Sequence, residues 1–273
     1  ESHPTDAAFG GIHLYDDLLE DYSRESIDRQ ARELGGWARR LEGIDPSTLT
    51  REERVERRML ADSIRARLFG LEELRPWQRN PSHYATTLAN SVAGQVLFAY
   101  APLTERARRV VSKLRQTPRF LEAAHKNVSD PPGLFAKVGI ETFEGVRDFF
   151  ERDLPLAFRD LDDMHLLGDL ADASSLALEA LNDYIGHLRE SVAPRSRASF
   201  RLGEERFGQL LHLTEGIDVP AQHLLEIALR DLEATQEEFR RVASQLGDDP
   251  LEVWNDVKTR HPKADELIGV VNR

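Results

Sequence analysis

Apolar residues recur every three to four positions along most of this chain, and that spacing places them on one face of an α-helix. The clearest early run consists of Val55, Met59, Leu60, Ile64, Leu68 and Leu71. Thr50 stands just before this run and Glu53 follows three residues later, which is the sequence signature of a capping box. The pattern predicts a helix from Thr50 to about Leu74.

The same periodicity predicts helices on both sides of this one, and prolines mark most of the breaks between them. The expected ranges are residues 14–22, 26–41, 83–97, 104–116, 119–127 and 133–152. Pro118 is expected to separate two of these helices, and residues 75–82 are expected to form a loop. Asp172 and Ser174 are the candidate N-caps of a further helix that reaches about Val192.

A long helix near the end of the chain has the most regular pattern. Asp218 is its expected N-cap and Gly247 its expected stop. Its stripe, expected to be buried, consists of Leu225, Ala228, Leu232, Phe239, Val242 and Leu246. A short final helix should begin at Asp249-Pro250. Because no segment alternates convincingly as a strand, the predicted fold class is all-α: an irregular multi-helix bundle of roughly ten helices with no substantial sheet. A sub-boundary is possible near residues 193–199.

Charge and composition exclude several classes of function. The 273 residues carry a net charge of −12, which argues against a broad surface for nucleic acid or anionic membrane. There is no cysteine, so disulfides, thiolate metal sites and cysteine nucleophiles are excluded. No apolar run approaches the roughly 20 residues that span a bilayer. The chain begins at Glu1 without a signal peptide, and a removed leader or a trimmed sequence would both give that start. A cytoplasmic and an exported location therefore both stay open.

Catalytic motifs are missing from the sequence. No histidine is followed by glutamate, so the His-Glu-x-x-His helix of zinc hydrolases does not occur. Glu122 and His125 have the spacing of one half of a di-iron site, but the nearest second pair, Asp162 and His165, has the wrong acid. We interpret these residues, and the pair His223–Glu226, as structural. The sequence predicts no catalytic residue, metal ligand or cofactor for this chain.

One basic helix face stands out against the acidic background. Arg106, Arg109 and Lys113 fall on it together. This face could dock an anionic ligand or an acidic partner segment, or it could be a solvated face that balances acids elsewhere in the fold. The sequence leaves both readings open.

Several short blocks, in this order and spacing, resemble the bacterial family known as domain of unknown function 885. They are the residues 15–22 (YDDLLEDY), 80–84 (NPSHY), 103–106 (LTER), 117–121 (TPRFL) and 200–207 (FRLGEERF), followed by the helix at 224–246. The resemblance implies a predominantly helical, zinc-metallopeptidase-like and hydrolase-like protein. Its members are about twice as long as this chain, and their zinc helix, His-Glu-x-x-Pro-Gly-His, lies in the second half.

No position in this chain matches that zinc helix, so the resemblance implies zinc only for the full-length parent. Residues 1–273 would then be a single helical region, the non-catalytic N-terminal part of a larger fold. It would form a cleft wall for a peptide substrate and pack on a catalytic half of the same protein or on another protein. The candidate cleft residues are Tyr84, Arg201, Glu204 and Glu205.

Two structural alternatives accompany this reading. Arg201 and Glu205 could simply pair at i,i+4 within a charge network. The whole chain could instead be a self-contained helical interaction module without enzymatic activity. Such a module would show no large apolar patch, whereas the N-terminal part of a larger fold would expose one where the other half docks.

Overall fold

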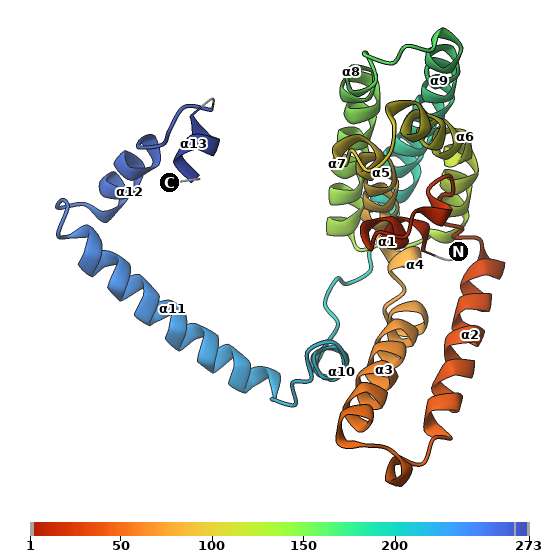
Figure 1. Cartoon of the computed structure of the whole chain (residues 1–273). Coiled ribbons are helices and arrows are strands. Elements are labelled where there is room, and N and C mark those ends of the chain that lie inside the picture. The colour runs from red at the N-terminus through yellow and green to blue at the C-terminus, as the bar shows by residue number, and fades with distance from the viewer. Residues whose placement is uncertain (1–2, 265, 272–273) are drawn as a thin grey trace. The chain divides into compact units, whose positions relative to one another are not determined.

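The computed structural model describes residues 3–264 and 266–271, and most of these residues are helical (Figure 1). Within those ranges there is no strand, only an isolated parallel bridge between Pro132 and Ala198. The expected all-α class is therefore confirmed. The chain forms two compact units. The first runs to Gly203 and includes Leu213–Glu215, and the second contains Glu204–His212 and the chain from Gly216 onward.

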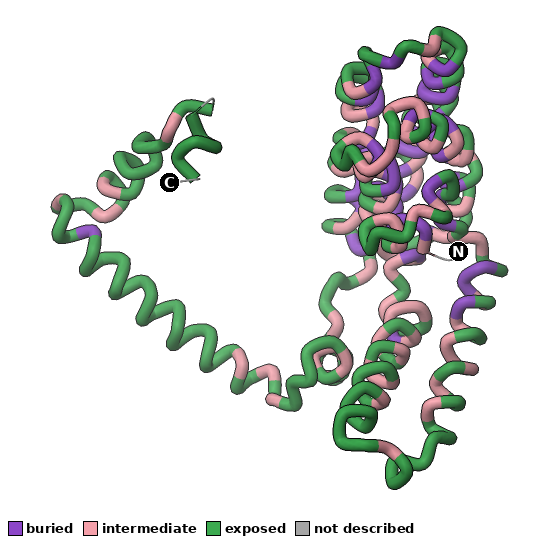
Figure 2. The backbone as a smooth tube through the Cα atoms, in the orientation of Figure 1, coloured by how far each residue is buried: buried purple, intermediate pink, exposed green. Residues whose placement is uncertain are grey.

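Four helices build the core of the first unit. They are α5 (Pro81–Leu97), α6 (Leu103–Asn127), α7 (Gly133–Asp148) and α9 (Met164–His187). Helix α5 packs on α6, α6 on α9, α9 on α7 and α7 on α5, so the four close a ring around one hydrophobic core. Buried residues concentrate in these helices (Figure 2). The fully buried side chains at their centre include Leu88, Leu114, Phe143 and Leu181.

A glycine sets the closest approach in this ring. At Gly139 of α7, an added Cβ would lie 2.6 Å from Cβ of Pro81 on α5. That is too short for any real contact between two carbon atoms, so α7 reaches α5 only because residue 139 has no side chain.

Helix α6 continues through Pro118, so the expected break there is wrong. Proline removes one backbone hydrogen bond from a helix interior and costs about 3 kcal/mol. Residues on both sides of it, Leu114 and Thr117 before and Phe120 and Leu121 after, are buried in the ring. Their burial offsets that cost, because ending the helix would expose them.

Helix α9 begins about two turns earlier than expected, at Met164, so the proposed caps Asp172 and Ser174 are wrong. The true cap is Asp163, whose side chain accepts a hydrogen bond from Leu166 N at 3.0 Å. Ser174 is instead a buried position inside the helix. Short elements extend two of the ring helices. A π-helical turn at Phe149–Asp153 and α8 (Leu154–Ala157) follow α7. A second π-helical turn at Leu188–Val192 and a 3-10 turn at Ala193–Arg195 follow α9.

The N-terminal segment contains α1 (Pro4–Phe9) and a 3-10 turn at His13–Tyr15, and the helix expected at residues 14–22 does not form. Side chains of α6 replace the helical hydrogen bonds there. Gln116 Oε1 accepts from Leu19 N at 3.1 Å, and Ser112 Oγ donates to the Asp17 carbonyl at 2.8 Å. A local sequence pattern gives no information about hydrogen-bond partners that lie almost a hundred residues away along the chain.

Helices α2 (Arg24–Glu42) and α3 (Arg51–Phe69) form an antiparallel hairpin (Figure 1). The capping box is confirmed: Glu53 N donates to Thr50 Oγ1 at 3.2 Å, and Thr50 N donates to the Glu53 carboxylate at 2.7 Å. A 3-10 turn at Pro46–Thr48 joins the two helices, and a π-helical turn at Gly70–Leu74 extends α3 as far as expected. The expected loop at residues 75–82 holds a short helix, α4 (Pro76–Arg79).

The second unit consists of most of α10 (Glu204–Glu215), then α11 (Ala221–Ala243), α12 (Pro250–Thr259) and α13 (Leu267–Val271). The N-cap of α11 is Pro220, which offers no side-chain hydrogen bond, so Asp218 is not the cap. Asp218 instead pairs with His212 Nδ1 at 2.6 Å. The N-cap of α12 is Asp249, as expected.

The stripe of α11 is exposed, which corrects the expectation that it is buried. Leu225 and Leu232 are 51% and 52% exposed, and Leu246 is 69% exposed. Ala243 is the sole buried position among the described residues of this unit. Most of α11 accordingly lies open along its length (Figure 2). The pattern identified an apolar face correctly, but the second unit by itself does not bury it.

Candidate functional site

The most connected polar centre of the first unit is Asp16, which is 1% exposed. Its Oδ2 accepts hydrogen bonds from His13 Nδ1 at 2.9 Å, from Arg109 NH1 at 2.8 Å and from the Tyr100 hydroxyl. Burial alone would raise the pKa of Asp16, but the hydrogen bonds from Tyr100, His13 and Gln95 outweigh it and lower the pKa. Asp16 is therefore a carboxylate that holds the neighbouring His13 together with Tyr100 and Arg109, which are distant in the sequence.

Tyr100 and His13 form the open side of this centre. Their rings stack with centroids 3.8 Å apart and planes 5° from parallel. Arg109 NH1 donates to Tyr100 Oη at 2.8 Å, and its guanidinium also lies over the Tyr100 ring. Burial and the hydrogen bond to Asp16 raise the pKa of Tyr100.

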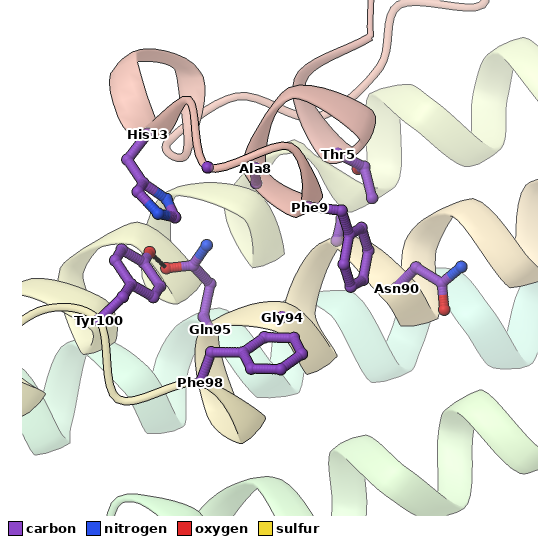
Figure 3. Close-up of a pocket in the computed structure, with 11 residues that line it drawn as sticks. Thr5, Ala8, Phe9, His13, Asn90, Gly94, Gln95, Phe98 and Tyr100 are labelled. Carbon is purple, nitrogen blue, oxygen red and sulfur yellow. Dashed lines mark hydrogen bonds between the residues drawn. The ribbon is translucent and has the colours of Figure 1, made fainter.

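A cavity of about 240 Å³ lies beside this pair, between α1 and the end of α5 (Figure 3). Phe9 and Phe98 form its apolar part, with their rings edge to face at 6.1 Å. His13, Gln95 and Tyr100 form its polar end. His13 Nδ1 lies 2.9 Å from Asp16 Oδ2, so the carboxylate fixes the orientation of the ring at this end of the cavity. The cavity thus combines an apolar part with a polar end, which suits a small amphipathic molecule.

Lys113 lies inside the fold behind this centre, and its side chain is 0% exposed. Its Nζ has no hydrogen-bond partner among the residues that the structure describes. Burial lowers the pKa of Lys113, against the attraction of Glu20, Asp16 and Asp17. One oxygen each of Asp16 and Glu20 is also buried without a partner. Buried polar atoms without partners are therefore concentrated around this segment.

No group of three or more His, Asp or Glu residues in the described part of the chain could hold a metal ion. The donor set that zinc requires, three protein ligands with an open position, therefore has no counterpart in these residues, and no reaction step through zinc follows from them. No helix in the described ranges combines the length and apolar character needed to cross a bilayer.

The sequence model of the family described as "Bacterial protein of unknown function (DUF885)" matches residues 4–267 of this chain. The chain belongs to the DUF885 family. The resemblance carried by the short sequence blocks is thereby confirmed at the level of the family. A search of curated proteins finds no match.

A solved structure described as a putative lipoprotein of unknown function from Shewanella oneidensis has the same fold as this DUF885 chain. The two share 22% sequence identity with a TM-score of 0.76. The alignment covers 98% of this chain and 52% of the other, so the DUF885 chain spans about half the length of that structure. At this identity the likeness establishes the fold alone.

The basic face of the DUF885 chain is engaged within its own fold. Arg106 donates to the Gln95 carbonyl at 2.6 Å and to the Ala101 carbonyl at 3.1 Å, which closes the end of α5. Arg109 binds Asp16 and Glu105, and Lys113 is buried. These three side chains therefore do not form an open anion site in the first unit.

The four cleft candidates have different surroundings within their own units. Tyr84 is 0% exposed, and its hydroxyl donates to the Trp77 carbonyl and accepts from Asn127 Nδ2 at 3.0 Å. Arg201 is exposed at the end of the first unit, while Glu204 and Glu205 are exposed in the first turn of α10 in the second unit. A role for these residues in a cleft stays a prediction.

The other candidate pairs have ordinary surface contacts. Glu122 binds Lys126 Nζ at 2.5 Å, and His223 Nδ1 lies 3.5 Å from Glu226. His125 stacks on His187 with ring centroids 3.7 Å apart. Each pair is accounted for by its neighbours on the same or an adjacent helix.

Sequence reasoning missed the Asp16 centre. Asp16 stands beside Asp17 in a chain with 48 acidic residues, so the pair had no diagnostic value. Arg109 could have indicated this centre, because it stands beside an apolar stripe and a partly buried arginine requires an acidic partner. Nothing in the sequence indicates that this partner lies 93 residues upstream.

Proposed function

We propose that this chain is the non-catalytic, helical N-terminal part of a longer, metallopeptidase-like DUF885 protein. In that protein the apolar face of α11 packs against the C-terminal half, and the chain forms one wall of the substrate cleft. The observation that carries this proposal is the second unit's lack of a core: Ala243 is its one buried position in the described chain.

The apolar stripe of α11 is only partly shielded from water. Fully burying a large apolar side chain contributes about 1.5–3 kcal/mol, and each member of the stripe forgoes roughly half of this. The stripe residues Leu225, Leu232, Phe239, Val242 and Leu246 are separated by seven, seven, three and four positions, which is the spacing of a seam between packed helices. A helix partner covering this seam supplies the burial that the second unit lacks.

The relative lengths support a choice of partner. The solved Shewanella structure is almost twice as long as the region it shares with this chain. A C-terminal half of comparable length is therefore the occupant that we propose for the seam. Zinc and the catalytic groups belong to that half in this proposal, and Arg201, Glu204 and Glu205 are the exposed residues here that could face a peptide.

A self-contained interaction module is the competing function. Such a module would cover its own apolar residues, as the four-helix ring of the first unit does. The open face of α11 therefore favours the larger fold.

Co-expression of this chain with the downstream half of its gene tests the proposal. We expect a stable complex, slowed amide exchange in α11, and chelator-sensitive peptide hydrolysis by the complex but not by this chain. Leu232→Gln should weaken the complex at least about tenfold, since it places a polar group in a dry seam. Glu233→Gln, at the neighbouring exposed position, is the matched control and should leave it unchanged. A stop codon directly after Arg273, or zinc-dependent turnover by this chain alone, would contradict the proposal.

A further inference from the structure

The cavity between α1 and the end of α5 has no part in the function proposed above, and its size limits what it can hold (Figure 3). Its volume is about 240 Å³. An apolar cavity of about 150 Å³ is large enough to bind benzene. The space beside the Asp16 centre therefore fits a molecule with one six-membered ring and a small substituent.

Two pairs of aromatic rings line this cavity. Phe9 and Phe98 meet edge to face at 6.1 Å, and His13 and Tyr100 stack at 3.8 Å. Figure 3 shows the two pairs apart from each other, with Gln95 between them. The two phenylalanines are 54% and 52% exposed, so their rings are open to contact with a ligand. A further ring placed there gains edge-to-face or offset-stacked contacts, which an aliphatic group of the same size does not.

Gly94 of α5 leaves the space beside the Phe9 ring open. A Cβ added at this position would lie 3.9 Å from Phe9 Cζ, with no other atom of the described chain outside its own surroundings within 4 Å. Glycine in a helix interior costs about 1 kcal/mol relative to alanine. A side chain at residue 94 would extend over the cavity wall next to Phe9, so the glycine keeps room there for a ligand.

The polar part of the lining is mostly uncharged. No carboxylate, lysine or arginine of the described chain belongs to the lining, and His13 is paired with Asp16. Asn90, Gln95 and Tyr100 contribute amide groups and a hydroxyl. A ligand hydroxyl both donates and accepts hydrogen bonds, so it suits such groups. A charged ligand would lose its hydration without meeting an opposite charge in the wall, which is costly.

We infer that this cavity binds a small uncharged aromatic alcohol of the phenol class. The aromatic ring lies against Phe9 and Phe98, over Gly94. The hydroxyl group points toward the polar end formed by Gln95 and Tyr100.

Titration of the whole chain with phenol, cyclohexanol and benzoate tests this inference, with the backbone amide resonance of Gln95 as the reporter. We expect saturable shifts with phenol. Cyclohexanol has the same hydroxyl and nearly the same size but no aromatic ring, and it should bind roughly two- to tenfold more weakly. Benzoate keeps the aromatic ring but carries a charge, and it should bind at least about tenfold more weakly than phenol.

Substitutions then locate the site. Gly94→Val should weaken phenol binding at least about tenfold, because its methyl groups occupy the space beside Phe9. Gly168→Val makes the same change at an exposed position of α9, where an added Cβ meets open space, and should have no effect. Phe98→Ala removes one aromatic wall and should weaken phenol binding roughly two- to tenfold. Leu97→Ala is its control, since Leu97 is 74% exposed and lies outside the lining.

Three results would overturn the inference. One is the lack of a saturable shift with phenol. Another is binding of cyclohexanol or benzoate as tight as that of phenol. The third is unchanged phenol binding by a folded Gly94→Val variant or, should that variant not fold, by Phe98→Ala.

Discussion

Arg109 NH1 donates a hydrogen bond to Asp16 Oδ2 at 2.8 Å and so joins helix α6 to the N-terminal segment. The Asp16 side chain is 1% exposed and that of Arg109 is 19% exposed, so the pair is largely shielded from water. Removing one partner of such a pair leaves an uncompensated buried charge.

Arg109→Ala should therefore lower the free energy of unfolding by about 3 kcal/mol, measured by urea denaturation of the whole chain. Arg115→Ala is the matched control on the same helix, since the ion pair of Arg115 with Asp169 is half exposed on both sides. It should cost at most about 1 kcal/mol. Equal losses in the two variants would show that the Asp16 centre does not stabilise the fold.

Gly139→Ala should destabilise the ring of helices by about 1–3 kcal/mol, because the added Cβ meets the Pro81 ring at 2.6 Å and forces α7 away from α5. Gly145→Ala, on the same helix, meets open space. It should be neutral or stabilising by up to about 1 kcal/mol, because alanine favours a helix. Thermal unfolding of the two variants side by side checks the prediction, and a Gly139→Ala variant as stable as Gly145→Ala would refute it.

Thr50→Ala should loosen the first turn of α3, since it removes the side chain that accepts from Glu53 N. Loss of such a cap costs about 1 kcal/mol. Amide exchange at the start of α3 should accelerate accordingly, whereas Ser63→Ala, at an exposed position inside the same helix, should leave it unchanged. No change in exchange after Thr50→Ala would mean that the capping box contributes little.

The parts of the fold that sequence could predict are those determined by neighbouring residues. The capping box at Thr50 and Glu53 lies within four positions, and the sequence contains everything it needs. The segment around Leu19 is different, because its backbone finds its partner on Gln116 and so forgoes the expected helix. Pro118 fails as a helix break for the same reason, since tertiary burial outweighs a local cost.

The functional features of the chain could likewise be predicted from the sequence only where neighbouring residues determine them. Periodicity identified the apolar face of α11 but not its exposure within the second unit, because exposure depends on how the whole unit packs. Glu20 and Asp16 looked like two acids among many, and only the fold shows that each is buried with an unused oxygen. Burial of a charged residue depends on distant helices and is not encoded in its immediate neighbours.

The stacked rings of His125 and His187 make the stability of the first unit depend on pH. Burial, then the nearby His125 and Arg195, lower the pKa of His187 below its usual 6.5. The unfolded chain therefore binds a proton at this residue more readily than the folded chain does. Between the lowered folded pKa and about 6.5, the free energy of unfolding should fall as pH falls.

Melting temperatures measured between pH 8 and 5 should accordingly decline toward the acid end in the unsubstituted chain. His187→Phe keeps an aromatic ring for the stack but cannot titrate, so its decline should be shallower. His165→Gln, at an exposed position on the same helix, should leave the decline as it is. Half-buried His83, whose pKa burial also lowers, should preserve part of the slope in every variant. A His187→Phe curve parallel to that of the unsubstituted chain would assign the pH dependence to other groups.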